Sequence, residues 1–318
     1  MGFLYSQLFV TPVYPKTSFA GQTVIVTGAN TGLGKEAARH FARLGASKVI
    51  LAVRNSEAGE QAKRDIVTST GCDSDNLEVW PLDLLSYDSC RSFADRVSKL
   101  PRVDVLLENA GVAGETFSLA GGHERMVAVN VISTFYLALL ILPKLKASAK
   151  EHSINPRLTI VSSEVHGHTT FPQRKEPNIF DAVDDESKAR PAEIYPVSKL
   201  LGVLVFREIA PKLEGSGVIL NMLNPGLCHS ELSRDSGWFV QFMKLLLART
   251  TEVGSRTLVA AASAGLESHG KYMSDARMND DALSDFVKSE DSKESGRKVW
   301  NELSDILESI QPGVTSNL

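Results

Sequence analysis

Cysteine, excess positive charge and long apolar runs are all scarce in this chain of 318 residues. The three cysteines, Cys72, Cys90 and Cys228, are odd in number and far apart, so they fit neither a disulfide framework nor the spacing of metal ligands. This cysteine usage favours a reducing compartment, and we therefore expect a cytoplasmic protein that holds no metal ion.

Charge and hydrophobicity exclude two further classes of protein. The 34 Lys and Arg residues against 38 Asp and Glu give a formal net charge of −4, which is not the basic footprint of a nucleic-acid binder. The longest apolar runs, 131–142 and 238–248, are shorter than the roughly 18 residues that indicate a membrane span. We expect neither a nucleic-acid partner nor a membrane span.

The first 20 residues lack the basic and continuous apolar regions of a secretory signal. Gly2 and Ser6 fit the myristoylation pattern, but the bulky Phe3 and Tyr5 oppose acylation. Residues 1–20 are therefore expected to form an apolar arm packed on the surface of the domain.

Short β-branched runs alternate with helical stretches through the first two-thirds of the chain. Strands are predicted at 23–28, 48–53, 77–83, 103–111, 157–163 and 218–226, with helices near 32–44, 57–68, 86–99, 122–145 (ending near Pro143) and 194–213. Continuous apolar strands separated by helices indicate a parallel sheet covered on both faces. The expected fold class is α/β, a doubly wound, Rossmann-type sheet.

Length alone, at roughly 150 residues per domain, would suggest two domains, but no linker divides the chain. The segment 164–194 is interpreted as a loop, and 274–295 as a surface excursion before a last helix near 296–309. We predict one domain over 21–312, which includes substrate loops at 164–194 and 228–250.

A glycine-rich turn, TGANTGLG at 27–34, closes the first strand and opens the first helix. Gly28 permits the tight turn, Gly32 lets the backbone approach a pyrophosphate, and Gly34 allows the helix to pack closely on the strand. Because the turn lies between a strand and a helix, it favours dinucleotide binding over a purely structural turn.

The spacing G-x-x-x-G-x-G in this turn resembles the short-chain dehydrogenase/reductase family. In NAD-preferring relatives the second strand ends in a carboxylate, whereas this chain has Val53 followed by Arg54. A guanidinium attracts the 2′-phosphate that an acidic group would repel, so Arg54 favours NADP(H) over NAD(H). The alternative is a solvated loop arginine.

Tyr195 and Lys199 form the second signature, YPVSK. Residues four apart share a helix face, so the phenol and the ammonium are expected to point into one cleft. The ammonium and an oxidised nicotinamide would lower the pKa of the phenol, which is about 10 when unperturbed, and allow it to exchange a proton with substrate.

The resemblance adds two residues to this pair. It implies that Ser163 hydrogen-bonds the substrate oxygen, with Ser162 as the rival because neighbouring strand residues point to opposite faces. It also implies that Asn130 anchors a water beside the lysine, against the alternative of a structural hydrogen bond. The expected catalytic tetrad is Asn130, Ser163, Tyr195 and Lys199.

Further matches complete the predicted cofactor site. The resemblance implies that Asp83 contacts the adenine and that Ser230 holds the nicotinamide carboxamide or a phosphate; Glu108 stands where the family has the first Asn of NNAG. The expected cofactor-binding residues are Gly28, Asn30, Thr31, Gly32, Leu33, Gly34, Arg54, Asp83, Leu84, Asn109, Ala110, Gly111, Tyr195, Lys199, Pro225, Gly226 and Ser230.

The late segments GKYMSD and VWNEL, with the arginine after the second strand, look like the retinol-dehydrogenase-like branch of the family. Phe171, Phe180 and the stripe Trp238, Phe239, Phe242 and Met243 are candidates to roof a pocket for a bulky apolar substrate, although 238–248 also fits a packing helix or a subunit contact. His166 and His168 are interpreted as solvated loop residues.

The sequence thus predicts an NADP(H)-dependent oxidoreductase that interconverts a ketone or aldehyde and an alcohol. We expect it to act mainly as a ketoreductase, in specialised metabolism or on a retinal-like substrate. Two alternatives stay open: a non-catalytic NADP(H)-binding sensor or scaffold, and a non-redox epimerase or cyclase. The expected partner is a small molecule, with a homodimer as an open alternative to a monomer.

Overall fold

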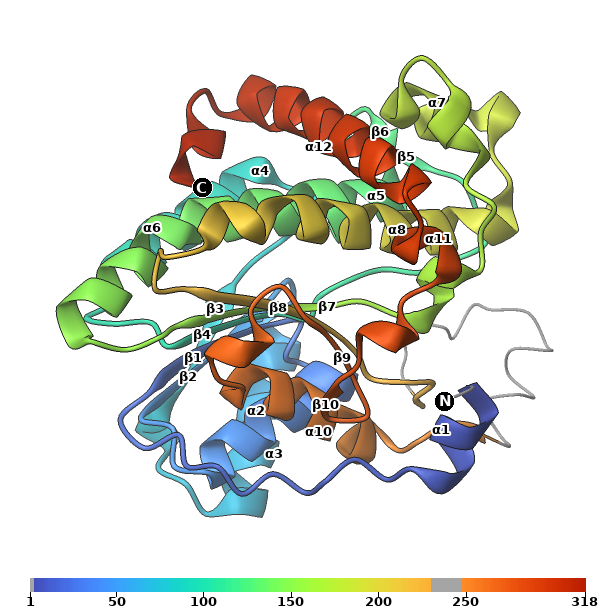
Figure 1. Cartoon of the computed structure of the whole chain (residues 1–318). Helices are drawn as coiled ribbons and strands as arrows, with labels where there is room; N and C mark the ends of the chain where they lie inside the picture. The colour runs from blue at the N-terminus through green and yellow to red at the C-terminus, as the bar shows by residue number, and fades with distance from the viewer. Residues whose placement is uncertain (1–2, 230–246) are drawn as a thin grey trace.

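A sheet of eight strands runs through the molecule in the order β10-β9-β8-β7-β4-β1-β2-β3 (Figure 1). The structure is a computed structural model, and it describes residues 3–229 and 247–318. Neighbouring strands are parallel except for the antiparallel pair of β9 and β10. The strands are β1 (Thr23–Thr27), β2 (Lys48–Val53), β3 (Leu77–Pro81), β4 (Val105–Glu108), β7 (Arg157–Val161), β8 (Ile219–Asn224), β9 (Tyr272–Ser274) and β10 (Arg277–Met278).

The predicted parallel sheet is confirmed, and each of its six expected strands forms inside its expected range. β1 is buried at every residue, which matches an unbroken apolar run covered on both faces. The expected surface excursion at 274–295 instead begins at the sheet edge with β9 and β10. Strands of three and two residues are too short to show a hydrophobic alternation in the sequence. β9 is stabilised by its parallel pairing with β8.

Helices cover both faces of the sheet (Figure 1). One face carries α2 (Gly32–Arg43), α3 (Ser56–Thr70) and α10 (Thr251–Ser263); the other carries α4 (Tyr87–Ser98), α6 (Thr134–His152), α8 (Pro191–Ile209) and the outer α12 (Asp291–Ile310). The sequence interpretation assigned no helix to 251–263. Shorter elements are α1 (Phe3–Phe9), α5 (Arg125–Val127), α7 (Ile179–Asp184), α11 (Asp285–Lys288) and the hairpin of β5 (Leu119–Ala120) and β6 (His123–Glu124).

The helix that was expected to end near Pro143 continues to His152. Proline interrupts the hydrogen bonding of a helix at a cost of about 3 kcal/mol. Leu142 and Leu145 on either side are fully buried in the apolar cluster, and this burial offsets the cost. Among the described residues, Arg125–His152 is the one helix apolar enough to cross a membrane, and 89% of its most apolar window is buried inside the protein. It is a core helix of the sheet.

The first helix of the N-terminal arm packs on the domain differently from the prediction. Helix α1 buries Gln7, which is 9% exposed, and leaves Leu4, Tyr5, Leu8 and Phe9 exposed. Helix α1 therefore contacts the domain through a polar side chain, whereas Pro12 and Phe19 further along the arm are buried against it.

Candidate active site

Nearly all the described candidate residues lie where parallel strands end. Gly28 follows β1, Arg54 follows β2, Asn109 follows β4, and Ser163 lies two residues beyond β7. Parallel strands end at one edge of a sheet, and here β4 and β7 lie on one side of β1 while β2 and β3 lie on the other. The order in which strands are added to the sheet thus reverses between β1 and β4, and open α/β sheets bind their ligands at such a point.

The glycine-rich turn has the backbone shape that the sequence predicts. Gly28 and Gly32 have φ values of +67° and +57°, which residues that carry a Cβ rarely adopt. A Cβ on Gly34 would lie 2.5 Å from the backbone oxygen of Gly28 and 2.4 Å from Nδ2 of Asn109. Close packing of helix on strand therefore requires glycine at this position.

The N-terminus of α2 is suited to an anion. Thr31 is its N-cap residue, yet no side chain caps the helix, and its first turn contains no acidic residue. The first N–H groups of a helix need acceptors from outside it and favour negative charge. Residues 28–34, including Asn30 and Leu33, therefore fit the pyrophosphate of a dinucleotide.

Asn109 fixes the turn from the neighbouring strand. Its Nδ2 donates to the backbone oxygens of Thr27, at 2.9 Å, and Gly28, at 3.4 Å. The Thr27 hydroxyl accepts from the backbone nitrogens of Asn109 and Ala110, both at 2.9 Å. The sequence interpretation missed Thr27, although the threonine that opens TGANTGLG was a visible signal.

Arg54 and Asp83 end adjacent strands. Arg54 is exposed, and no ion pair or hydrogen bond of its side chain is recorded within the described residues. Asp83 accepts from the backbone nitrogen of Leu85 at 3.0 Å, and its neighbour Leu84 is buried. Lys35, by contrast, is paired with Asp65 of α3, so its charge is already offset by a carboxylate.

Tyr195 lies on the first turns of α8 and faces Ser163. The Ser163 hydroxyl lies close enough to the Tyr195 phenol to oppose part of the rise in its pKa, whereas Ser162 Oγ is buried and has no hydrogen-bond partner among the described residues. Of the two serines, it is Ser163 that the structure brings to the tyrosine. Burial raises the pKa of Tyr195 to about 12, so its phenol is protonated at neutral pH.

Lys199 lies one helical turn beyond the tyrosine. Its Nζ is 5.9 Å from the centre of the Tyr195 ring and donates to the backbone oxygen of Val161 at 3.2 Å. Burial lowers the pKa of Lys199 to about 8. A Cβ on Gly111 would come within 3.8 Å of the same Nζ, which puts Gly111 beside the ammonium.

Asn130 lies in a π-helical turn, Ala128–Ser133, that precedes α6. Such turns are rare and are often found at functional sites. Its Nδ2 donates to the backbone oxygen of Val112 at 2.8 Å and to Oγ of Ser198 at 3.0 Å, and its Oδ1 accepts from the Val112 nitrogen at 2.9 Å. The amide thus ties the segment after β4 to the helix that carries Tyr195 and Lys199.

A family model for short chain dehydrogenases matches residues 22–169. A short chain dehydrogenase/reductase of Cryptosporiopsis sp. (strain 8999) is 51% identical, and the aligned region covers 100% of both chains. The chain belongs to the short-chain dehydrogenase/reductase family. A short-chain dehydrogenase of Penicillium roqueforti (strain FM164) is 43% identical over 99% of this chain and 84% of its own length.

Solved structures share the fold of this short-chain dehydrogenase/reductase. An uncharacterized protein of Mycobacterium paratuberculosis is 27% identical and has a TM-score of 0.68. The match covers 92% of this chain and 95% of that protein. A short chain dehydrogenase of Escherichia coli CFT073, solved with NADPH, has a TM-score of 0.58 at 24% identity, covering 82% of this chain and 99% of its own.

Pro225 and Gly226 follow β8 at the same edge of the sheet, and Gly226 has a φ of +80°. Ser230 lies outside the described residues, as do Trp238, Phe239, Phe242 and Met243. Their expected roles in the cofactor site and the pocket roof therefore stay predictions.

Three expectations about the 164–194 segment need correction. It is not one long loop, because it contains α7, several 3₁₀ turns and the start of α8. Phe171 and Phe180 are each 1% exposed within the apolar cluster, so they are core residues and do not roof an open pocket. His166 is buried, not solvated: its Nδ1 bonds the Ser163 backbone oxygen at 2.7 Å and its Nε2 accepts from the Ser284 nitrogen at 3.0 Å. His168 is exposed as expected.

Glu108 is a buried carboxyl directly under the site. It is 2% exposed, and its Oε1 has no hydrogen-bond partner among the described residues. Burial raises the pKa of Glu108 well above its usual range, because the charged form loses its hydration, and this favours the protonated form. A neutral carboxyl is similar in shape and polarity to the amide that the family has at this position.

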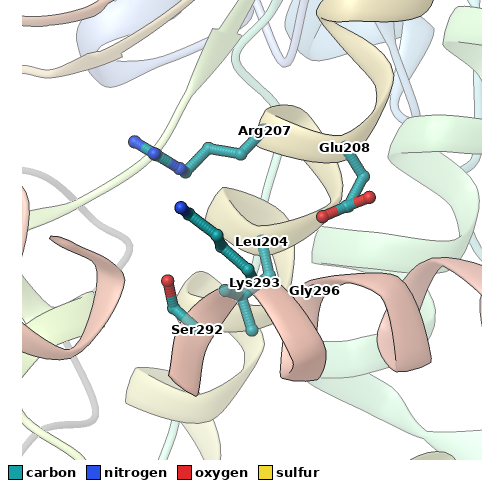
Figure 2. A pocket seen from close by; sticks show the side chains of 6 residues that line it. All are labelled: Leu204, Arg207, Glu208, Ser292, Lys293 and Gly296. Carbon is teal, nitrogen blue, oxygen red and sulfur yellow. The ribbon is translucent and has the colours of Figure 1, made fainter. Parts of the chain in front are cut away.

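A polar hollow of about 120 Å³ lies between α8 and α12 (Figure 2). It is lined by Leu204, Arg207, Glu208, Ser292, Lys293 and Gly296. Leu204 is nine residues beyond Tyr195, which corresponds to about 13 Å along the helix at a rise of ~1.5 Å per residue. The hollow is separate from the carboxyl edge of the sheet, where the candidate residues converge.

Proposed function

We propose that this protein is an NADP(H)-dependent oxidoreductase that interconverts a carbonyl and an alcohol. The observation that carries the proposal is the grouping of Ser163, Tyr195 and Lys199, with Nζ of Lys199 5.9 Å from the centre of the Tyr195 ring, beside a turn and a helix end that fit a pyrophosphate. A protein that only bound the nucleotide would need none of these three side chains. We propose the site residues in the roles that the family resemblance implies.

Tyr195 is the proton donor during reduction. Since its pKa is raised to about 12, the phenol carries its proton at neutral pH and can give it to a developing alkoxide. Ser163 donates a hydrogen bond to the same substrate oxygen and holds it next to the phenol. The bound nicotinamide supplies the hydride for reduction, or accepts it for oxidation.

Lys199 and Asn130 support the tyrosine. The ammonium of Lys199 stabilises the phenolate that remains after proton transfer, because opposite charges within a few ångströms favour each other. Asn130 holds Val112 and Ser198 in place, and so fixes the spacing between the cofactor side of the site and α8. A protonated phenol can donate a proton, which favours the reductase direction. The exposed Arg54 favours NADPH, the cofactor that reduction would use.

The finer assignments belong to the same proposal. The substrate is a bulky, apolar ketone or aldehyde of specialised metabolism, and kinship with the retinol-dehydrogenase-like branch remains a prediction. One catalytic domain spans 21–312. The enzyme works in the cytoplasm, where its three cysteines stay reduced, as a monomer or a homodimer.

The Tyr195→Phe substitution tests the proposal. Removing a positioned general acid costs about 10²- to 10⁴-fold in kcat, so turnover of ketones with NADPH should collapse while the Kd for NADPH stays unchanged. Tyr136→Phe is the matched control. It removes a phenol hydroxyl that lies away from the site, where it accepts a hydrogen bond from Arg91 and donates one to Gln311. It should leave turnover intact.

Two outcomes would overturn the proposal. If wild-type protein binds NADPH but turns over no ketone, aldehyde or alcohol in a broad panel, it is a sensor or scaffold. If it converts substrate without net consumption of NADPH, it is an epimerase or cyclase.

A further inference from the structure

The N-terminal helix is joined to residues 227 and 247 through one buried amide. Nε2 of Gln7 donates to the backbone oxygens of Leu227 and Leu247, each at 3.0 Å, and its Oε1 accepts from the Leu227 nitrogen at 3.2 Å. These two leucines lie on either side of residues 230–246. The Gln7 side chain therefore links two backbone segments, at Leu227 and at Leu247, that are 20 positions apart in the sequence.

Arg249 makes a second tie at the same place. Its guanidinium donates to the backbone oxygens of Ser6, at 2.8 Å, and Val10, at 2.9 Å, and pairs with Asp275 at 2.7 Å. Its other terminal nitrogen is 3.4 Å from the backbone oxygen of Pro225. The Arg249 side chain is 5% exposed and that of Asp275 is 11% exposed, so the pair is shielded from water and is costly to break.

The backbone around Arg249 is joined directly to the segment after β8. The Arg249 nitrogen donates to the Leu227 oxygen and the His229 nitrogen donates to the Arg249 oxygen, both at 2.9 Å. The arm is also in contact with the glycine expected to bind cofactor. A Cβ on Gly226 would lie 2.5 Å from Oε1 of Gln7 and 2.9 Å from Nη1 of Arg249.

The tied segment borders the phosphate-binding turn. A Cβ on Gly254 of α10 would lie 2.3 Å from Sγ of Cys228 and 2.8 Å from Cδ2 of Leu33. Cys228 and Leu33 therefore flank the same point of α10. The backbone from Pro225 to His229 thus runs beside the end of the cofactor cradle, and α1 packs directly on this stretch (Figure 1).

The choice of buried residues argues against a passive cover. An arm that only shielded apolar surface would bury its leucines, yet Leu4 and Leu8 are 57% and 54% exposed while the amide of Gln7 is buried. A buried amide is tolerated only where its hydrogen bonds are made, so these bonds define one position of the arm against the backbone.

We propose that Gln7 and Arg249 are positioning residues that make the N-terminal arm part of the NADP(H) site. They hold Pro225–His229 at the nicotinamide side of the cofactor, although neither residue carries out chemistry. This inference rests on the proposed function, because it takes NADP(H) as the ligand. The adenine side, with Arg54 and Asp83, lies at the opposite end of the strand order and should not depend on the arm.

The test compares two ligands that differ in the nicotinamide half. NADPH spans the site, whereas adenosine 2′,5′-bisphosphate fills only the adenine side. Gln7→Met keeps the side-chain volume and removes the bonds to Leu227 and Leu247, which should weaken NADPH binding about tenfold. The Kd for the bisphosphate should stay within twofold of the wild-type value. Amide hydrogen exchange at His229 and Arg249 should accelerate in the same variant.

Asn155→Ala is the matched control. Asn155 is a partly buried amide that donates to the Gly217 backbone oxygen at 3.1 Å, away from the carboxyl edge of the sheet. The Asn155→Ala protein should be less stable than wild type, while the ratio of its Kd values for NADPH and the bisphosphate stays unchanged. An equal loss of both ligands in Gln7→Met, or no loss of either, would overturn the inference. Wild-type protein that binds the bisphosphate but not NADPH would instead overturn the proposed function.

Discussion

Replacing Gly34 with alanine tests the packing of helix α2 on the sheet. The added Cβ would lie 2.4 Å from Nδ2 of Asn109 and 2.5 Å from the backbone oxygen of Gly28, and real Cβ atoms do not approach so closely. The Asn109 side chain could rotate away, but the Gly28 oxygen belongs to the backbone of the turn. Either the turn or the helix must therefore shift.

The magnitude follows from the bonds that the shift breaks. Asn109 loses hydrogen bonds to Thr27 and Gly28, worth about 1 kcal/mol each, and overpacking adds about 1–3 kcal/mol. Alanine returns about 1 kcal/mol of helix propensity. The net loss in the free energy of unfolding is about 2–4 kcal/mol by the same values. NADPH affinity should fall with it, since the shifted turn no longer directs the α2 N–H groups at the pyrophosphate.

Urea unfolding and NADPH titration of Gly34→Ala measure both effects. Gly202→Ala is the matched control, because Gly202 is also helical, in α8, and a Cβ there meets no atom within 4 Å. Gly202→Ala should be as stable as wild type or more stable, by up to about 1 kcal/mol. A Gly34→Ala protein with wild-type stability and an unchanged Kd for NADPH would refute the reasoning.

Three further predictions concern charge. Arg54→Glu should reverse the cofactor preference, raising kcat/KM for NADH relative to NADPH by about 100-fold or more, because the carboxylate repels the 2′-phosphate and binds the ribose hydroxyls; an unchanged ratio would remove Arg54 from the site. Since burial lowers the pKa of Lys199 to about 8, kcat/KM for NADPH should fall as pH rises through that value. Lys199→Arg, which stays protonated, should abolish this fall, and a flat wild-type profile would contradict it. Burial raises the pKa of Glu108, so the folded state holds a proton that the unfolded state loses, and stability should decline as pH rises above the usual carboxyl range. Glu108→Gln should remove up to about 1.4 kcal/mol of this decline per pH unit in urea unfolding; parallel slopes for the two proteins would exclude a neutral Glu108.

The strand, turn and helix at 23–43 could be predicted from the sequence because each signal is local. A β-branched run makes a buried strand, and the glycines at Gly28 and Gly32 permit positive φ whatever surrounds them. The spacing of Tyr195 and Lys199 likewise determines their common face, since helix geometry depends only on position. The parallel sheet and the family resemblance followed from these elements and motifs, whereas the order of the strands did not.

The remaining features depend on contacts between residues far apart in the chain. Ser162 and Ser163 are chemically identical neighbours, and only the position of α8 assigns Ser163 to Tyr195. His166 can be buried because its Nε2 accepts a hydrogen bond from the backbone nitrogen of Ser284, which is 118 residues away in the sequence. Gln7 finds its partners 220 and 240 residues further on, so nothing in the first 20 residues could reveal that this polar side chain is buried. Periodicity and motifs report what a segment can form, whereas burial and hydrogen-bond partners exist only once the whole chain has packed.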